Sequence, residues 1–100
     1  MKRYSVSYVR RAEQDLTEIA DYIKRDSPKN SAVWLETVDK ILGRLAFFPY
    51  SGVIPKDKYL ASLGYRIVVL GEYLVFYCVR GRKVEIRRVL HGRRRYGFLL

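Results

Sequence analysis

Residues 65–90 read YRIVVLGEYLVFYCVRGRKVEIRRVL, which is three apolar runs separated by two glycine-containing turns. Runs of this length that are rich in β-branched and aromatic residues, with such turns between them, are typical of strands joined as hairpins. The middle run is apolar at nearly every position, as expected for a central strand that is covered on both faces. We therefore predict three consecutive strands at Tyr65–Leu70, Glu72–Val79 and Lys83–Leu90.

Arg88 interrupts the alternation of the third predicted strand. Val84 and Ile86 lie on one face of that strand, and a strict period of two places Arg88 on the same face. Either the strand bulges before Arg88, or this arginine points into a functional cleft. Both interpretations stay open from the sequence.

The N-terminal half of the chain has a different period. After a short predicted strand at Arg3–Ser7, apolar residues recur every three or four positions until about Arg25, the spacing of an amphipathic helix. The dipeptide Ser27-Pro28 then suits the cap and the first turn of a second helix. Its apolar stripe predicts that this helix runs to about Leu45 or Phe48.

The order of the predicted elements defines an α+β fold. The short link between the two helices indicates an antiparallel helical hairpin. Prolines between Pro49 and Asp57 mark an irregular loop before the strands. We predict a single domain over residues 1–100 with the order β-α-α-β-β-β, in which the helical hairpin packs on a small, mostly antiparallel sheet.

The charge of the chain is concentrated in its sheet half. The 100 residues carry a formal net charge of +10, and from Ala61 onward nine basic residues stand against two acidic ones, which gives +7. The run Arg93-Arg94-Arg95 directly follows the last predicted strand. Such a field attracts polyanions or acidic proteins. A solvated basic surface that keeps a small protein soluble has the same composition, so both interpretations stay open.

The composition also indicates what is not expected. The one cysteine, Cys78, lies in the apolar run of the middle strand, so neither an internal disulfide nor a cysteine nucleophile is expected. The spacing of cysteine and histidine is not that of a zinc site, and no sequence feature indicates another metal or a cofactor. No apolar run suits a signal peptide or a membrane span. A cytoplasmic protein without a membrane partner is therefore expected.

Five short motifs carry a resemblance to a known family through their order and spacing. They are Ala12-x-x-Asp15-Leu16-x-x-Ile19-x-x-Tyr22-Ile23, Pro49-x-x-Gly52, Gly64-Tyr65-Arg66, Tyr73-Leu74-Val75-Phe76-Tyr77 and Arg88-Val89-Leu90-His91-Gly92-Arg93-Arg94. Over nearly its whole length the chain resembles the RelE/ParE superfamily of toxins from toxin–antitoxin modules. The resemblance implies a cytoplasmic toxin that a cognate antitoxin holds inactive by wrapping it. A basic toxin suits an acidic antitoxin.

The superfamily has two branches with different targets. RelE-like members are endoribonucleases that cut mRNA on the ribosome, whereas ParE-like members poison DNA gyrase. Where many RelE-like nucleases have an arginine this chain has Leu74, and where they often have a lysine it has Val68. The loss of a cation that contacts a transition-state phosphate slows such a reaction strongly. Both departures favour the ParE-like interpretation, with ribosome-dependent mRNA cleavage as the alternative.

The resemblance also implies site residues for each branch. A metal-independent nuclease would use, as its catalytic residues, His91, Arg66, Arg93 and Tyr96. The histidine would supply a proton donor and the arginines a phosphate clamp. For binding of the target, the expected residues are Arg66, Arg88, Arg93, Arg94, Arg95 and Tyr96. Structural roles stay open beside these: His91 ends a strand, Arg66 lies on a strand surface, and Tyr96 pins the tail to the domain.

Two further questions stay open from the sequence. A plain nucleic-acid-binding module would also be basic and rich in tyrosine, although Tyr73 and Tyr77 occupy core-compatible positions of the middle strand. The antitoxin would bind either as an amphipathic acidic helix on the sheet and the helical hairpin, or as a strand added at an exposed sheet edge.

Overall fold

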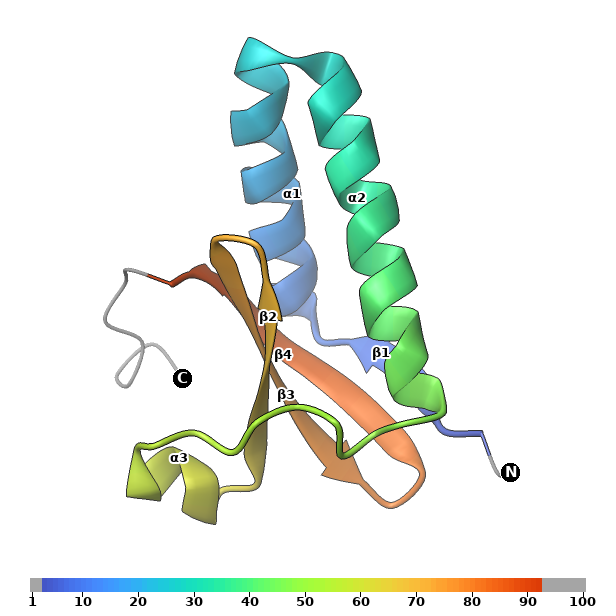
Figure 1. Ribbon diagram of the computed structural model, residues 1–100, viewed down its shortest axis with the longest axis vertical. Helices are drawn as coiled ribbons and strands as arrows, with labels where there is room; N and C mark the ends of the chain where they lie inside the picture. Colours follow the sequence, from blue (N-terminus) through green and yellow to red (C-terminus); the bar gives the residue numbers. More distant parts are fainter. Residues whose placement is uncertain (1–2, 93–100) are drawn as a thin grey trace.

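A four-stranded sheet with a helical hairpin against one face organises the chain, as Figure 1 shows for the computed structural model, which describes residues 3–92. The elements follow in the order β1 (Ser5–Tyr8), α1 (Arg10–Asp26), α2 (Pro28–Gly43), a 3₁₀ turn (Arg44–Ala46), α3 (Lys58–Ser62), β2 (Tyr65–Leu70), β3 (Tyr73–Arg80) and β4 (Lys83–His91). The predicted α+β class and the helical hairpin on the sheet are confirmed.

The turn between α1 and α2 follows the predicted capping pattern. The Ser27 hydroxyl accepts a hydrogen bond from the backbone N–H of Asn30 (3.1 Å), and Pro28 occupies the first turn of α2. Ser31 then donates its buried hydroxyl to the carbonyl of Ala20 (2.7 Å), which ties the two helices together close to the turn. A turn of one residue therefore sets the helices antiparallel, as expected.

The sheet has the strand order β1-β4-β3-β2, with β1 parallel to β4 and the other pairs antiparallel. β3 is buried on both faces. Val75 and Tyr77 lie in the core beneath the helical hairpin, and Phe76 and Cys78 lie in a second core cluster that includes Leu60. The prediction of a central strand covered on both sides is confirmed.

The register of β4 resolves the question about Arg88. Tyr77 pairs with Ile86, but Phe76 pairs with Arg88, so Arg87 is an extra residue and β4 bulges there. The bulge is the first of the two interpretations. The Arg88 side chain is buried against α1 rather than directed into the pocket that is described below.

The boundaries of the strands differ from the prediction by one or two residues. The two hairpin loops contain only two residues each, Gly71-Glu72 and Gly81-Arg82, and both glycines have positive φ (61° and 59°). A two-residue loop of this conformation extends the ladders on either side of it. β3 therefore begins at Tyr73 instead of Glu72 and extends to Arg80, and β1 covers Ser5–Tyr8 instead of Arg3–Ser7.

Helix α3 was not predicted. The Asp57 carboxylate caps it by accepting hydrogen bonds from the N–H groups of Tyr59 (2.9 Å) and Leu60 (3.1 Å). Five residues are too few for an apolar period to be visible, and tertiary packing of Leu60 stabilises the helix. Within residues 3–92, no helix is both long and apolar enough to cross a membrane.

Candidate functional site

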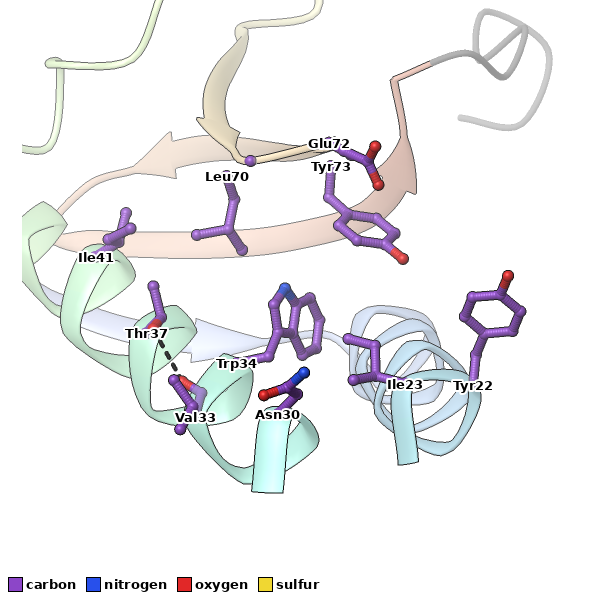
Figure 2. Close-up of a pocket in the computed structure, with 11 residues that line it drawn as sticks. Tyr22, Ile23, Asn30, Val33, Trp34, Thr37, Ile41, Leu70, Glu72 and Tyr73 are labelled. Atoms are coloured by element: carbon purple, nitrogen blue, oxygen red, sulfur yellow. Dashed lines mark hydrogen bonds between the residues drawn. The ribbon is translucent and has the colours of Figure 1, made fainter. Parts of the chain in front are cut away.

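An apolar groove lies between the helical hairpin and the β2–β3 turn (Figure 2). Its volume is about 500 Å³. We call it the hairpin groove, and its lining residues are Tyr22 and Ile23 of α1, Asn30, Val33, Trp34, Thr37 and Ile41 of α2, and Leu70, Gly71, Glu72 and Tyr73 of the β2–β3 turn. Apolar side chains therefore dominate a concave surface, as is common in binding sites.

The sequence builds this groove through helical spacing. The α2 residues that line it recur every three or four positions, so they share one face of the helix. Trp34 points from this face toward the sheet in Figure 2, and its ring packs edge-to-face on Tyr73 with 5.5 Å between centroids. Thr37 donates its hydroxyl to the carbonyl of Val33 (2.9 Å), so this hydroxyl is satisfied within the helix. The groove thus suits the apolar face of an amphipathic segment.

The same groove residues hold the end of β4. Tyr73 pairs with His91, and their rings pack edge-to-face with centroids 5.5 Å apart. Glu72 places its Oε2 atom 3.9 Å from His91 Nε2, and its carbonyl accepts a hydrogen bond from the N–H of Gly92 (2.8 Å). The basic run Arg93–Arg95 follows Gly92 in the sequence. The groove residues therefore contact His91 and Gly92, the last residues of the described part of the chain.

Four of the predicted site residues lie outside the described part of the chain. They are Arg93, Arg94, Arg95 and Tyr96. Their proposed roles in catalysis or target binding stay predictions that rest on the sequence.

Arg66 is placed at the other end of the sheet, where it holds a loop. Its Nη1 atom donates to the carbonyls of Tyr50 (2.9 Å) and Gly52 (3.0 Å), and its guanidinium lies 5.2 Å from the centre of the Tyr50 ring. Arg66 therefore has a structural role in addition to the target-binding role that the sequence predicts.

Tyr77 holds the same loop from inside the core. Its hydroxyl donates to the carbonyl of Pro49 (2.8 Å) and accepts from the N–H of Gly52 (2.9 Å). A Cβ atom at Gly52 would lie 2.6 Å from this hydroxyl, which explains the Pro49-x-x-Gly52 motif. Burial raises the pKa of Tyr77 above its ordinary value, so the neutral donor is favoured. Sequence reasoning placed Tyr77 in the core but missed this contact, for which the motif was the available signal.

Arg66 and His91 do not come together. Arg66 pairs with Tyr77 on β2 and β3, whereas His91 pairs with Tyr73, so the two lie four residues and two strands apart. At roughly 3.3 Å per residue and 4.8 Å per strand, their Cα atoms are about 16 Å apart. Val75, buried beneath the helices, lies between them. These two side chains therefore do not converge on one phosphate.

Arg88 forms a buried ion pair with α1. Its Nε atom lies 2.8 Å from Asp15 Oδ2 and its Nη2 atom 3.2 Å from Oδ1, while the N–H of Val89 also donates to Oδ2 (3.0 Å). Asp15 and Arg88 are only 4% and 7% exposed. Arg88 therefore links β4 to α1 through this ion pair. The target-binding role that the sequence predicts for Arg88 stays a prediction.

The two positions at which the chain departs from RelE-like nucleases are partly buried and pack against the core. Leu74 packs against the cluster on the face of the sheet away from the hairpin, and Val68 packs against the core beneath the hairpin. Both side chains are half-buried. In this chain, the two positions at which many RelE-like nucleases have a basic residue therefore hold side chains that pack against the core.

Comparisons with known proteins agree with this architecture. The fold is similar to that of the chromosomal ParDE TA system from P. aeruginosa (TM-score 0.73, 19% identity, 91% of this chain and 98% of that chain). It is also similar to the toxin–antitoxin complex RelBE2 from Mycobacterium tuberculosis (TM-score 0.61, 24% identity, 89% of this chain and 98% of that chain). A search of curated proteins found no match.

The family is shown by the sequence itself. A family model described as the ParE toxin of type II toxin–antitoxin system, parDE, matches residues 6–96, which is most of the chain. The resemblance to the RelE/ParE superfamily, and the preference for its ParE-like branch, are thereby confirmed. The chain belongs to the ParE toxin family of type II toxin–antitoxin systems.

Proposed function

We propose that this toxin inhibits DNA gyrase in the cytoplasm and that it acts by binding rather than by cleaving RNA. The observation that carries the proposal is the packing of Val68 and Leu74 against the two core clusters, at positions where many RelE-like nucleases have cations. The wide separation of Arg66 from His91 adds to it, because phosphate cleavage needs cations and a proton donor that converge on one group. Membership of the ParE family supports the same target.

The proposed partner that neutralises the toxin is a cognate acidic antitoxin. The hairpin groove supports an apolar contact, and the net charge of +10 supports attraction to an acidic chain. A segment seated on Tyr73 would also reach His91, from which the basic run Arg93–Arg95 continues. Of the two binding modes left open by the sequence, the groove favours the amphipathic helix.

The proposed active surface combines the C-terminal cluster Arg93–Tyr96 with Arg66. Charge reversal of Arg93 and Arg94 to glutamate is expected to abolish growth arrest while the far-UV circular dichroism spectrum stays unchanged. Undiminished growth arrest by the folded double variant would remove this surface from the proposal.

The test of the target is a gyrase assay. Purified toxin, freed from its antitoxin, is added to gyrase and relaxed plasmid, and supercoiling and cleavage are followed by gel electrophoresis. The proposal expects loss of supercoiling and accumulation of cleaved plasmid, both reversed by antitoxin. Normal supercoiling in the presence of a toxin that still arrests growth would overturn it.

Ribosome-dependent mRNA cleavage is the second candidate function, and one observation favours it. His91, the one histidine of the chain, is partly exposed at the end of β4, two residues before Arg93 and five before Tyr96 in the sequence. This candidate expects that His91→Ala lowers mRNA cleavage on programmed ribosomes by about a hundredfold or more. Intact mRNA after incubation with the wild-type toxin would exclude it.

A further inference from the structure

A second surface, made of residues that do not line the hairpin groove, exposes several large apolar side chains within one short segment. Between residues 47 and 54, five large apolar side chains are 46 to 61% exposed: Phe47, Phe48, Tyr50, Val53 and Ile54. We call residues 47–54 the aromatic loop. Single exposed apolar residues are normal on a protein surface, whereas their gathering in one short segment is typical of an interaction site.

The backbone of the aromatic loop is held firmly although its side chains face solvent. Tyr77 and Arg66 bind the carbonyls of Pro49, Tyr50 and Gly52, as described above. In addition, Val53 exchanges two backbone hydrogen bonds with Ile67 of β2 (2.9 and 2.8 Å). The exposed side chains therefore stand on a prearranged backbone, and a partner that binds them would order little of it.

Positive charge surrounds these apolar side chains. Arg3 lies 5.5 Å from the centre of the Phe47 ring, and Arg66 lies over Tyr50. From residue 44 to residue 66 the chain has four basic residues (Arg44, Lys56, Lys58 and Arg66) and one acidic residue (Asp57). The Asp57 carboxylate is itself engaged as the cap of α3. Arg3 and Arg66 thus form a basic rim beside an apolar centre, the layout of a protein–protein interface, and the other basic residues lie close to the loop in the sequence.

We propose that the aromatic loop is the docking surface for an acidic protein that is the target of the toxin, separate from the hairpin groove that receives the antitoxin. Charge complementarity selects this occupant, because a second copy of the chain would bring the same basic rim. Nucleic acid fits less well. Two of the five side chains are aliphatic and offer no ring for stacking, and Arg66 Nη1 already donates to two carbonyls.

The aromatic loop and the hairpin groove are placed so that a target and an antitoxin can each bind its own surface. The aromatic loop follows the end of α2 at Gly43, whereas the groove is lined by one face of α2, from Asn30 to Ile41, and by the β2–β3 turn (Figure 1). The identification of the acidic target as gyrase rests on the proposed function.

The experiment compares the Phe48→Ser and Ile54→Ser double variant with the wild type and with Leu35→Ser. Leu35 is a matched control because it is also exposed and apolar (39% exposed) but lies on α2, outside the groove lining and the loop. Circular dichroism and thermal melting establish that each variant folds. Affinity for gyrase holoenzyme, for the antitoxin and for a single-stranded RNA probe is measured by titration, and growth arrest is measured after induction in cells.

The loop variant is expected to lose at least tenfold in gyrase affinity and to lose growth arrest, while its antitoxin affinity stays within twofold of the wild type. Leu35→Ser is expected to retain all three properties. If the loop variant does not fold, the single Ile54→Ser variant is used with the same expectations. The test therefore separates loss of the docking surface from loss of the fold.

Three results would overturn the proposal. They are unchanged gyrase affinity with unchanged growth arrest, a fall in antitoxin affinity, and a fall in binding to a single-stranded RNA probe while gyrase binding stays. If the wild-type toxin does not bind gyrase, the proposed function fails, and growth arrest then tests whether the aromatic loop is a docking surface for another target. If the loop variant then loses growth arrest but keeps its antitoxin affinity, the result supports docking to another acidic protein. If the loop variant still arrests growth, the proposed docking surface is overturned.

Discussion

At the scale of single residues, the contact between Gly52 and Tyr77 controls the loop that follows the helical hairpin. The Tyr77 hydroxyl bridges Pro49 and Gly52, and the space for it exists only because Gly52 has no side chain. The carbonyl oxygen of Ile67 lies at 3.0 Å from the same Cβ position, so backbone as well as side chain would have to move. The loop and the core of the sheet are therefore built as one unit.

Gly52→Ala is expected to destabilise the protein by about 2–3 kcal/mol, because the added methyl overpacks a buried site. The free energy of unfolding from urea denaturation measures this. Gly43→Ala is the matched control, since a Cβ atom there meets nothing within 4 Å and the backbone is helical. That control is expected to change stability by less than about 1 kcal/mol, in the stabilising direction. Equal effects at the two glycines would contradict the role given to Gly52.

Tyr8 gives the stability of the protein a dependence on alkaline pH. Burial, with a smaller contribution from Asp39, raises the pKa of Tyr8 to about 12 from its ordinary value of 10.0. The folded state therefore favours the neutral phenol. This contribution is complete below pH 10 and is lost as the pH rises through 12.

The free energy of unfolding is accordingly expected to fall between pH 10 and pH 12, and to fall less steeply in Tyr8→Phe. Urea denaturation at several pH values measures both slopes. Tyr22→Phe is the control, since Tyr22 is exposed. Identical slopes for the wild type and Tyr8→Phe would show that Tyr8 titrates alike in the folded and unfolded states.

At the scale of elements, Asp15 and Arg88 join α1 to the last strand. β1 pairs with β4 only as far as Ile86, and beyond it the Asp15 carboxylate accepts the N–H of Val89. A side chain on a helix thus continues the bonding of β4 where its neighbouring strand has ended. The bulge at Arg87 shifts the register of β4 just before Arg88 enters this contact.

Asp15→Asn is expected to lower the free energy of unfolding by about 3–5 kcal/mol, since it leaves the Arg88 charge buried without its partner. The Asp15→Asn and Arg88→Met double variant is expected to lose less than the sum of the two single changes. Urea denaturation of the four proteins completes the cycle. Effects that add within about 0.5 kcal/mol would show that the two side chains are not coupled.

Most elements could be predicted from the sequence because their signals are local. The period of α1 and α2, the cap at Ser27 and the glycine turns each depend on neighbouring residues. The broken alternation at Arg88 indicated either a bulge or a functional cleft, and only the register of β4 decided between them. Its partner Asp15 could not be predicted, because a contact between residues so far apart in sequence follows from the packing of α1 on the sheet. α3 was missed because it is short and depends on Leu60 packing.

At the scale of the whole molecule, the candidate sites arise where distant segments meet. The basic end of the chain could be predicted from composition, but the hairpin groove could not, since it forms only when α2 and the β2–β3 turn approach each other. The exposed side chains of the aromatic loop were likewise hidden in the sequence, because apolar residues such as Phe48 and Ile54 give no sign there that they face solvent.

Val33→Asp is expected to weaken antitoxin binding by about tenfold or more, because it places a charge in an apolar groove and repels an acidic partner. Val33 is 51% exposed, so the melting temperature is expected to change little. Isothermal titration calorimetry with the purified antitoxin measures the affinity. Val33→Lys is the control, since it adds a charge of the opposite sign, and an equal loss in both variants would show that charge does not matter there.

The pairing of β1 with β4 has a consequence for how the toxin is made. Tyr8, near the start of the chain, aligns with Ile86, near its end, and β4 lies between β1 and β3 in the sheet. A ribosome must therefore translate β4 before the sheet can close, and contacts between such distant residues form slowly. The host meets the folded toxin only after β4 has been synthesised. An antitoxin already present in the cell can then bind the toxin as it folds.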